Sequence, residues 1–254
     1  CGARKNENGE SICLNYGELT SLSIDPIEKK PFARFYPGSR ILSVGSYGCN
    51  LFCPFCQNYE ISTARQGEIP TRKVKPETIA NLAKDSEASG NIGVAFTYNE
   101  PMVGWEFVRD TAKLVREKDM VNAVVTNGSA TPEILREVLP YIDAFNIDLK
   151  GFTEEYYKKL GGDLETVKTF IQLAAESAHV ELTTLIVPGE NDSPEEMARE
   201  AAWIASIDEE IPLHITRFFP RYKYEGRKPT DVDRMRELAA VARKELTTVM
   251  LGNV

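Results

Sequence analysis

The chain has few histidines and no long hydrophobic run. Only two histidines, His179 and His214, occur among its 254 residues. No apolar stretch approaches the roughly 18 residues that a membrane-spanning helix needs, which argues against such a helix. A net charge of −8 weighs against an extensive nucleic-acid interface, and no repeat or low-complexity segment divides the chain. We therefore expect one acidic globular domain with no membrane partner, and the net charge makes a nucleic-acid partner the less favoured alternative.

Three of the five cysteines lie close together in the string Cys49-Asn-Leu-Phe-Cys53-Pro-Phe-Cys56. A structural zinc site is one interpretation, but zinc needs a fourth ligand, and Cys1 and Cys13 are far away in the sequence. An odd number of closely spaced cysteines also disfavours a disulfide. Three thiolates can hold three irons of a [4Fe–4S] cluster and leave the fourth iron open to a substrate.

From residue 40 onward, short apolar stretches alternate with helical patterns. The expected strands are rich in β-branched residues, as in strands buried on both faces: residues 40–47, 92–98, 121–126, 143–149, 180–187, 212–218 and, with a weaker pattern, 247–251. Helices are expected over 101–118, 131–139, 194–206 and 231–244, and two more within 153–178. This alternation predicts a parallel sheet with right-handed crossovers. Six or seven units are too few for a closed barrel of eight, so residues 40–254 are predicted to form a partial (β/α)6 barrel.

Residues 1–39 are predicted to form an N-terminal extension. Residues 11–24 alternate around a turn signal at Asn15-Tyr-Gly17, which predicts a β-hairpin, and the polar residues 1–10 are expected to be a loosely held tail. The chain begins at Cys1 without a methionine and ends on an apolar stretch. Both ends look cut, so we expect the natural protein to continue beyond them.

Polar residues follow several of the expected strands. In parallel α/β folds, the loops at the carboxyl ends of strands carry function. Asn99 and Glu100 follow the second strand, where either can cap the next helix, and the Glu100 carboxylate can also bind a positively charged amino group. Thr126 and Asn127 end the third strand, either as part of a simple turn or as hydrogen-bond partners of a ribose or a carboxylate.

Asp148 and Lys150 end the fourth strand and alternate toward the same side of it. They can hold ribose hydroxyls and a carboxylate, or they can form a solvated surface ion pair. The sixth strand continues into an aromatic and basic segment, residues 214–224. This segment either lines the opening through which a protein substrate enters or binds a nucleic acid. His214 and Arg217 lie three residues apart, so on a strand they face opposite ways.

The cysteine spacing, with Phe55 before the last cysteine, is typical of the radical S-adenosylmethionine (radical SAM) enzymes. The chain resembles the pyruvate formate-lyase activating enzymes of that group in four further strings: Tyr98-Asn-Glu-Pro101, Thr126-Asn-Gly128, Asp148-Leu-Lys150 and Val187-Pro-Gly189. Residues 25–31, 35–38 and 212–220 resemble the radical SAM enzymes of the "AmmeMemoRadiSam system". The resemblance covers nearly the whole chain. One departure is Val125, where the glycyl-radical activases have an acidic residue.

The resemblance implies that Cys49, Cys53 and Cys56 ligate a [4Fe–4S] cluster whose open iron binds S-adenosylmethionine (SAM). It also implies a set of cofactor-binding residues: Phe55, Asn99, Glu100, Thr126, Asn127, Asp148, Lys150, Val187 and Tyr222. Reductive cleavage of SAM then gives a 5′-deoxyadenosyl radical that abstracts hydrogen from a protein or peptide substrate. An electron donor such as flavodoxin or ferredoxin and an oxygen-poor cytoplasmic setting are further expectations.

Two other functions remain open at this point. A radical SAM enzyme that modifies RNA would need a basic face, which the acidic composition does not indicate. A non-catalytic iron–sulfur electron carrier would explain the cysteines but would leave Glu100, Asp148 and Lys150 without a role.

Overall fold

The computed structural model describes residues 1–254 and contains one eight-stranded sheet. Its strands are β4 (Ser21–Pro26), β5 (Arg40–Gly45), β7 (Asn91–Phe96), β8 (Val121–Thr126), β9 (Ala144–Asp148), β10 (His179–Ile186), β11 (Leu213–Arg217) and β12 (Val249–Gly252). They lie in the order β12-β11-β10-β9-β8-β7-β5-β4. Neighbours from β5 to β12 are parallel, and β4 is antiparallel to β5. Because β4 and β12 remain unpaired edges, the sheet forms an open barrel, as the sequence predicts.

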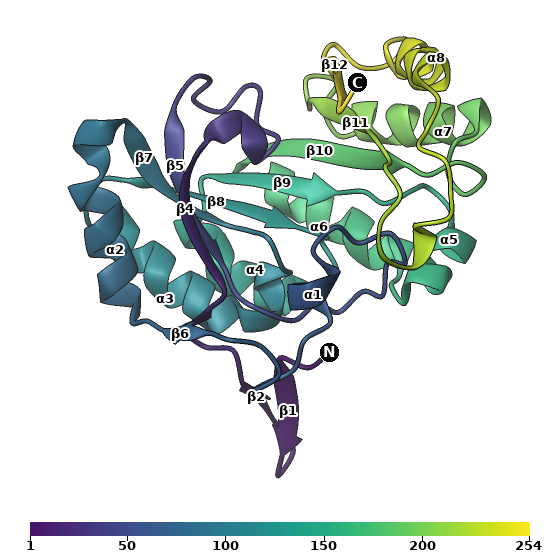
Figure 1. Cartoon of the computed structure of the whole chain (residues 1–254). Helices are drawn as coiled ribbons and strands as arrows, with labels where there is room; N and C mark the ends of the chain where they lie inside the picture. The colour runs from purple at the N-terminus through teal and green to yellow at the C-terminus, as the bar shows by residue number, and fades with distance from the viewer.

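Helices connect the parallel strands. They are α1 (Tyr59–Ser62), α2 (Pro76–Asp85), α3 (Trp105–Arg116), α4 (Pro132–Val138), α5 (Glu154–Leu160), α6 (Leu164–Ala175), α7 (Pro194–Ala205) and α8 (Val232–Ala242). The main sheet contains six parallel strands between β5 and β11, since β6 lies outside it. A helix follows each of the six, which confirms the (β/α)6 pattern. Figure 1 shows α2, α3 and α4 side by side along one face of the sheet. Helix α2 is an element that the sequence analysis did not predict.

Alternate residues of each strand pack on opposite faces of the sheet, as the period of a strand requires. Leu42 faces the helices and belongs to the main core, whereas its neighbour Ile41 faces the other way. On that second face, Ile27 and Phe32 pack against small side chains such as Ala144. The segment before β5, residues 27–39, therefore fills the inside of the barrel near the start of β9.

The N-terminal hairpin lies closer to the start of the chain than predicted. Its strands are β1 (Arg4–Glu7) and β2 (Glu10–Cys13), so the prediction of a loose tail over residues 1–10 was wrong. Asn8 and Gly9 have φ values of 54° and 90°, which suit the two-residue turn of a hairpin. Arg4 also forms an ion pair of 2.7 Å with Glu106 of α3, which holds the hairpin on the body of the molecule.

The residues expected to form the second hairpin strand pair elsewhere. Strand β3 (Glu18–Leu19) pairs with β6 (Arg72–Lys73), and β4 joins the main sheet beside β5. Figure 1 shows β1 and β2 projecting at one end of the molecule, away from the C-terminus beside α8. None of the helices is long and apolar enough to cross a membrane.

Candidate functional site

The cysteine loop leaves the carboxyl end of β5. The backbone N–H of Leu51 and the Nδ2 atom of Asn127 lie 3.4 Å and 3.5 Å from the Cys49 sulfur, and the Ser62 hydroxyl lies 3.2 Å from the Cys56 sulfur. Burial raises the pKa of the Cys49 thiol to about 12 and that of the Cys53 thiol to about 11. Both thiols are therefore neutral at pH 7 unless a bound cation favours the thiolate.

No three His, Cys, Asp or Glu side chains converge closely enough to share one metal ion. The triad thus lacks the four-ligand geometry of a structural zinc site. Each cysteine of a [4Fe–4S] cluster binds a different iron, so its ligands do not need to meet at one point. The arrangement of Cys49, Cys53 and Cys56 in one loop is compatible with a cluster.

Contacts from several elements fix the cysteine loop. The N–H of Phe52 donates to the carbonyl of Leu160 at the end of α5, at 2.8 Å. The N–H of Lys223 donates to the carbonyl of Pro54 at 3.0 Å. The segments that follow β9 and β11 therefore both contact the cysteine loop. Phe52 itself is 65 % exposed, so one aromatic ring of the loop faces solvent.

Glu100 is buried at the start of the 3₁₀ turn η3 (Pro101–Gly104), where its carboxylate caps the N–H of Met102 at 2.9 Å. It also accepts from the Thr126 hydroxyl and the Asn127 N–H, each at 2.7 Å. Burial is the largest influence and raises the pKa of Glu100 to about 7, although these hydrogen bonds oppose the rise. A carboxylate has about four acceptor positions, so one position remains for a further donor.

Asn99 makes four hydrogen bonds to the backbone near the cysteine loop. Its oxygen accepts from the N–H of Ser46, and its Nδ2 atom donates to the carbonyls of Tyr47, Gly48 and Glu100, at 2.9 to 3.2 Å. Asn99 thereby ties the carboxyl end of β5 to that of β7. This position beside the loop is established, and cofactor binding by Asn99 remains a prediction.

Asn127 links the end of β8 to the cysteine loop. Its Nδ2 atom lies 3.0 Å from Asn50 Oδ1 in addition to its contact with Cys49. Asn50 in turn donates to the Ser129 carbonyl at 2.6 Å. The preceding residue, Thr126, donates a hydrogen bond from its hydroxyl to Glu100. The predicted residues of the third strand and of the cysteine loop therefore come together.

Asp148 and Lys150 form an ion pair of 2.7 Å, which confirms that they face the same side. Their side chains are 32 % and 15 % exposed, so the pair is more buried than a typical surface pair. Burial alone lowers the pKa of Lys150, but the neighbouring Asp148 carboxylate helps to raise it above its ordinary value. The Lys150 ammonium is thus a fixed positive charge near the cysteine loop.

Aromatic residues cover the same loop. Phe55 and Val187 are buried in one apolar cluster with Phe218, and Cys53 packs against it. Tyr222 stacks on Tyr59 of α1, with ring centroids 4.6 Å apart. Tyr222 also has a φ of 53°, an uncommon conformation for a bulky residue. The segment after β11 therefore folds back over the cysteine loop.

His214 and Arg217 face opposite ways, as the sequence predicts. His214 contacts Glu181 of β10 at 2.6 Å, and His179 contacts the other oxygen of the same carboxylate at 2.9 Å. Arg217 instead donates to the carbonyl of Thr230. His214 thus belongs to a buried polar cluster away from the cysteines.

Sequence reasoning missed several residues that contact the site. These include Asn50, Tyr59, Ser62 and Tyr156. Asn50 adjoins Cys49 in the motif, which is the one signal that was available. The others depend on the folding of short helices against the loop, and no spacing in the sequence indicates that contact.

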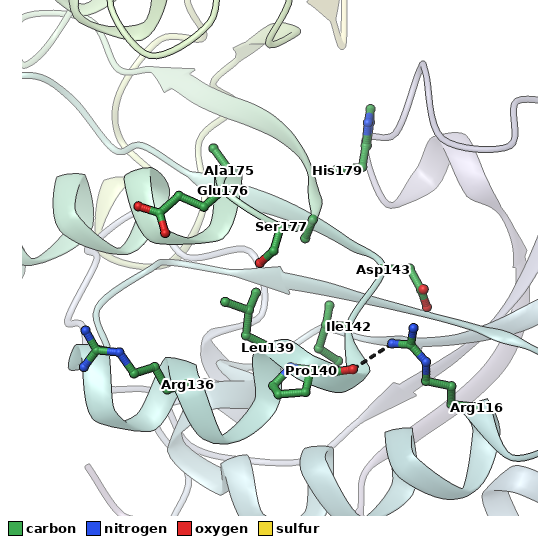
Figure 2. Close-up of a pocket in the computed structure, with 11 residues that line it drawn as sticks. Arg116, Arg136, Leu139, Pro140, Ile142, Asp143, Ala175, Glu176, Ser177 and His179 are labelled. Carbon is green, nitrogen blue, oxygen red and sulfur yellow. Dashed lines mark hydrogen bonds between the residues drawn. The ribbon is translucent and has the colours of Figure 1, made fainter.

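A surface pocket of about 600 Å³ lies away from the site. Figure 2 shows that its residues come from the ends of α3 and α4 and from the segment between α6 and β10. The dashed line marks the bond of 2.7 Å from Arg116 to the carbonyl of Pro140. Asp143 precedes β9 and His179 begins β10, so this pocket lies at the amino ends of the strands. It contains none of the predicted site residues.

Known proteins resemble this chain in sequence and in fold. An uncharacterized protein of Methanocaldococcus jannaschii is 39% identical over 100% of this chain and 76% of its own length. The pyruvate formate-lyase-activating enzyme of Clostridium pasteurianum is 27% identical over 67% of this chain and 71% of its own. The crystal structure of Streptococcus suis SuiB bound to S-adenosylmethionine has a TM-score of 0.63 and 13% identity, covering 84% of this chain and 51% of that one. That identity shows a shared fold alone.

The family itself follows from a profile match. The model of the radical SAM superfamily matches residues 43–201, which is more than half of the chain and includes the cysteine loop. Members of this superfamily use a [4Fe–4S] cluster and SAM. The chain belongs to the radical SAM superfamily.

Proposed function

We propose that this protein abstracts a hydrogen atom from a protein or peptide substrate, in the manner of the glycyl-radical activating enzymes. One observation carries the proposal: Asn127 contacts both Cys49, in the loop of three cysteines, and Glu100, a buried carboxylate with a free acceptor position. Membership of the AmmeMemoRadiSam group is part of the proposal and rests on the strings at residues 25–31, 35–38 and 212–220.

Cys49, Cys53 and Cys56 would hold the cluster, each through one iron. When bound and reduced, the cluster and SAM supply a 5′-deoxyadenosyl radical. The protein's own work is to bind, orient and exclude water. Phe55, Val187 and Phe218 form an apolar wall against Cys53, which restricts water on that side of the loop.

The Oε2 atom of Glu100 would use its free acceptor position to accept a hydrogen bond from the amino group of SAM. This oxygen accepts one bond, from Asn127, whereas Oε1 accepts two. An incoming ammonium favours the charged carboxylate, so it would lower the raised pKa of Glu100 again. Binding and ionisation of Glu100 are thereby coupled.

Lys150 and Asp148 would hold the carboxylate and the ribose of SAM. Lys150 offers a permanent positive charge, and the 32 % exposure of Asp148 leaves part of its carboxylate free for hydroxyl donors. The carboxyl ends of β5, β7 and β8 are held in place by hydrogen bonds of Thr126, Asn127 and Asn99. These bonds would keep the SAM-binding residues in position.

The substrate side is proposed to lie along residues 214–224 and the loop after Val187. Arg221 and Phe219 are exposed there, and aromatic and arginine side chains commonly anchor protein interfaces. The sheet ends in unpaired edge strands at β4 and β12, as expected for a barrel that is not closed. The resemblance to the Clostridium pasteurianum activating enzyme supports a protein substrate.

The entrance proposal predicts different effects on two activities. Replacing Arg221 and Tyr222 by alanine should suppress reaction with the true substrate and spare uncoupled SAM cleavage. Tyr222 also stacks on Tyr59 beside the cysteine loop, so it is equally a candidate for cofactor contact. If both activities fall together, the segment serves the cofactor and the entrance assignment is wrong.

The test of the proposed function is anaerobic reconstitution with iron and sulfide, reduction, and product analysis. Methionine and 5′-deoxyadenosine should accumulate, and candidate protein partners should couple that cleavage to hydrogen abstraction. Flavodoxin or ferredoxin should replace the chemical reductant, as expected for an enzyme of the reducing cytoplasm. A cluster that forms without any SAM cleavage would favour an electron carrier, and salt-sensitive RNA binding would favour an RNA substrate.

A further inference from the structure

One tyrosine hydroxyl is buried beside the cysteine loop without a hydrogen-bond partner. Tyr156 is 3 % exposed, and its hydroxyl makes no hydrogen bond. Buried tyrosine hydroxyls normally find a partner, because desolvating an unpaired polar group is unfavourable. The backbone of Tyr156 is fixed as well, since its N–H is capped by Thr153 at the start of α5.

The ring of Tyr156 is held firmly in place. A Cβ atom on Gly151 would lie 2.7 Å from the ring, so the absence of a side chain at Gly151 lets the ring pack against the backbone after β9. On its other sides Tyr156 shares an apolar cluster with Phe55 and Phe218, and Cys53 packs against that cluster. The hydroxyl of this buried ring is thus held in one place by packing.

The three cysteines differ in their hydrogen bonds. Cys49 has donors from Leu51 and Asn127, and Cys56 has the Ser62 hydroxyl. Cys53 has no donor from another residue, although it is the cysteine that packs against the cluster of Tyr156. The unpaired hydroxyl of Tyr156 therefore belongs to the buried cluster that Cys53 packs against, and the Cys53 sulfur lacks a donor from another residue.

We propose that Tyr156 donates a hydrogen bond to the sulfur of Cys53 once that sulfur is an iron-bound thiolate, and that it thereby raises the reduction potential of the cluster. A thiolate is a stronger acceptor than the neutral thiol, which explains why the hydroxyl acquires its partner only with the cluster. Hydrogen bonds to cluster sulfurs stabilise the more negative, reduced state. The inference rests on the proposed ligation by Cys49, Cys53 and Cys56, and it makes Tyr156 a positioning and tuning residue.

The test is Tyr156→Phe, which removes only the hydroxyl. The matched control is Tyr157→Phe in the same helix, whose buried hydroxyl accepts from the Lys150 N–H and whose ring belongs to the main core, not to the cluster that Cys53 packs against. Redox titration of the reconstituted proteins, followed by electron paramagnetic resonance, should give a more negative midpoint for Tyr156→Phe. The midpoint of Tyr157→Phe should equal that of the wild type.

Two further measurements separate tuning from a merely structural role. An exchangeable proton coupled to the reduced cluster should be seen in wild-type protein and be missing in Tyr156→Phe. The melting temperature of the cluster-free variant should not fall, because no partner is lost. Equal midpoints, or a clear loss of stability without the cluster, would overturn the inference. If wild-type protein assembles no cluster, the proposed function fails instead.

Discussion

Two buried glutamates lie at opposite ends of the barrel, and their pKa values are shifted in opposite directions. Glu100 lies at the carboxyl end, is 3 % exposed, and has a pKa raised to about 7. Glu181 lies near the amino end, is fully buried, and has a pKa lowered to about 2. Burial favours the neutral acid in both, so the difference comes from their partners.

Glu181 is saturated with donors. Its two oxygens contact both histidines of the chain, and they accept from the N–H groups of Ala33 and Arg34. These contacts hold the segment that fills the barrel, so Glu181 serves the fold. Glu100 has only three donors, all neutral, and retains one acceptor position. A buried acid with spare capacity at a strand end is suited to bind a cationic ligand.

The largest effect is expected at the carboxyl end, from loss of a cluster ligand. Cys53→Ser should abolish the iron–sulfur cluster, because two thiolates and a serine cannot replace three thiolates. Iron and sulfide analysis should find about four of each per wild-type chain, the content of a [4Fe–4S] cluster, and almost none in the variant. Cys13→Ser, outside the loop, is the control and should retain the cluster. Stoichiometric zinc without iron–sulfur absorption in the wild type would contradict the assignment.

At the amino end, Glu181→Gln should destabilise the fold, on the order of 3 kcal/mol, because it breaks a buried charge network. Since the pKa of Glu181 lies below its ordinary value of 4.5, its stabilisation is complete above that pH and is lost as the pH falls toward 2. Urea unfolding should show that the free energy of unfolding falls less between pH 7 and pH 3 in the variant than in the wild type.

Other acids also weaken the fold at low pH, because Asp25 and Glu190 have lowered pKa values as well. The informative quantity is therefore the difference between wild type and Glu181→Gln at each pH. A difference that does not change between pH 7 and pH 3 would show that Glu181 is not the charged centre of its cluster.

Glu100→Ala should weaken SAM binding by roughly 1.5–3 kcal/mol, the cost of a lost hydrogen bond to a charged group. The cluster should still assemble, and calorimetry of SAM binding measures the change. Glu200→Ala is a matched control, since Glu200 is also buried and has a pKa raised to about 8, but it lies on α7. Unchanged affinity in Glu100→Ala would mean that this carboxylate only caps its helical turn.

The sequence predicts those parts of the molecule that depend on local pattern. The β-branched runs place six parallel strands within a few residues, and the cysteine spacing identifies the loop after β5. The hairpin was misplaced because Asn15-Tyr-Gly17 and Asn8-Gly9 are both turn signals, and only the second has two residues with positive φ at a two-residue turn. Helix α2 was missed, and its first turn has no side-chain cap.

Contacts across strands could not be predicted in this way. Glu181 meets His214 because β10 and β11 pair with Thr183 opposite His214, a register that the sequence alone does not specify. The position of Tyr156 in the apolar cluster that Cys53 packs against likewise depends on how α5 packs, and Gly151 permits it by lacking a side chain. The register between strands and the close packing of distant segments are therefore the features that the sequence does not predict.

The smallest change in stability is expected for the Asp148–Lys150 pair, and it sharpens the contrast between the two ends. Both side chains are partly exposed, so Asp148→Ala and Lys150→Ala should each lower the free energy of unfolding by about 1 kcal/mol, the upper end for a solvated pair and less than for Glu181→Gln. Both should nevertheless slow SAM cleavage, because the pair lies beside Cys53 and supplies the fixed charge there. The Lys168–Glu165 pair on α6 is the control, with a 2.7 Å separation and no contact with the cysteine loop. If the Asp148 and Lys150 variants cleave SAM at the wild-type rate, the pair is only a surface contact, and Glu100 alone distinguishes the carboxyl end.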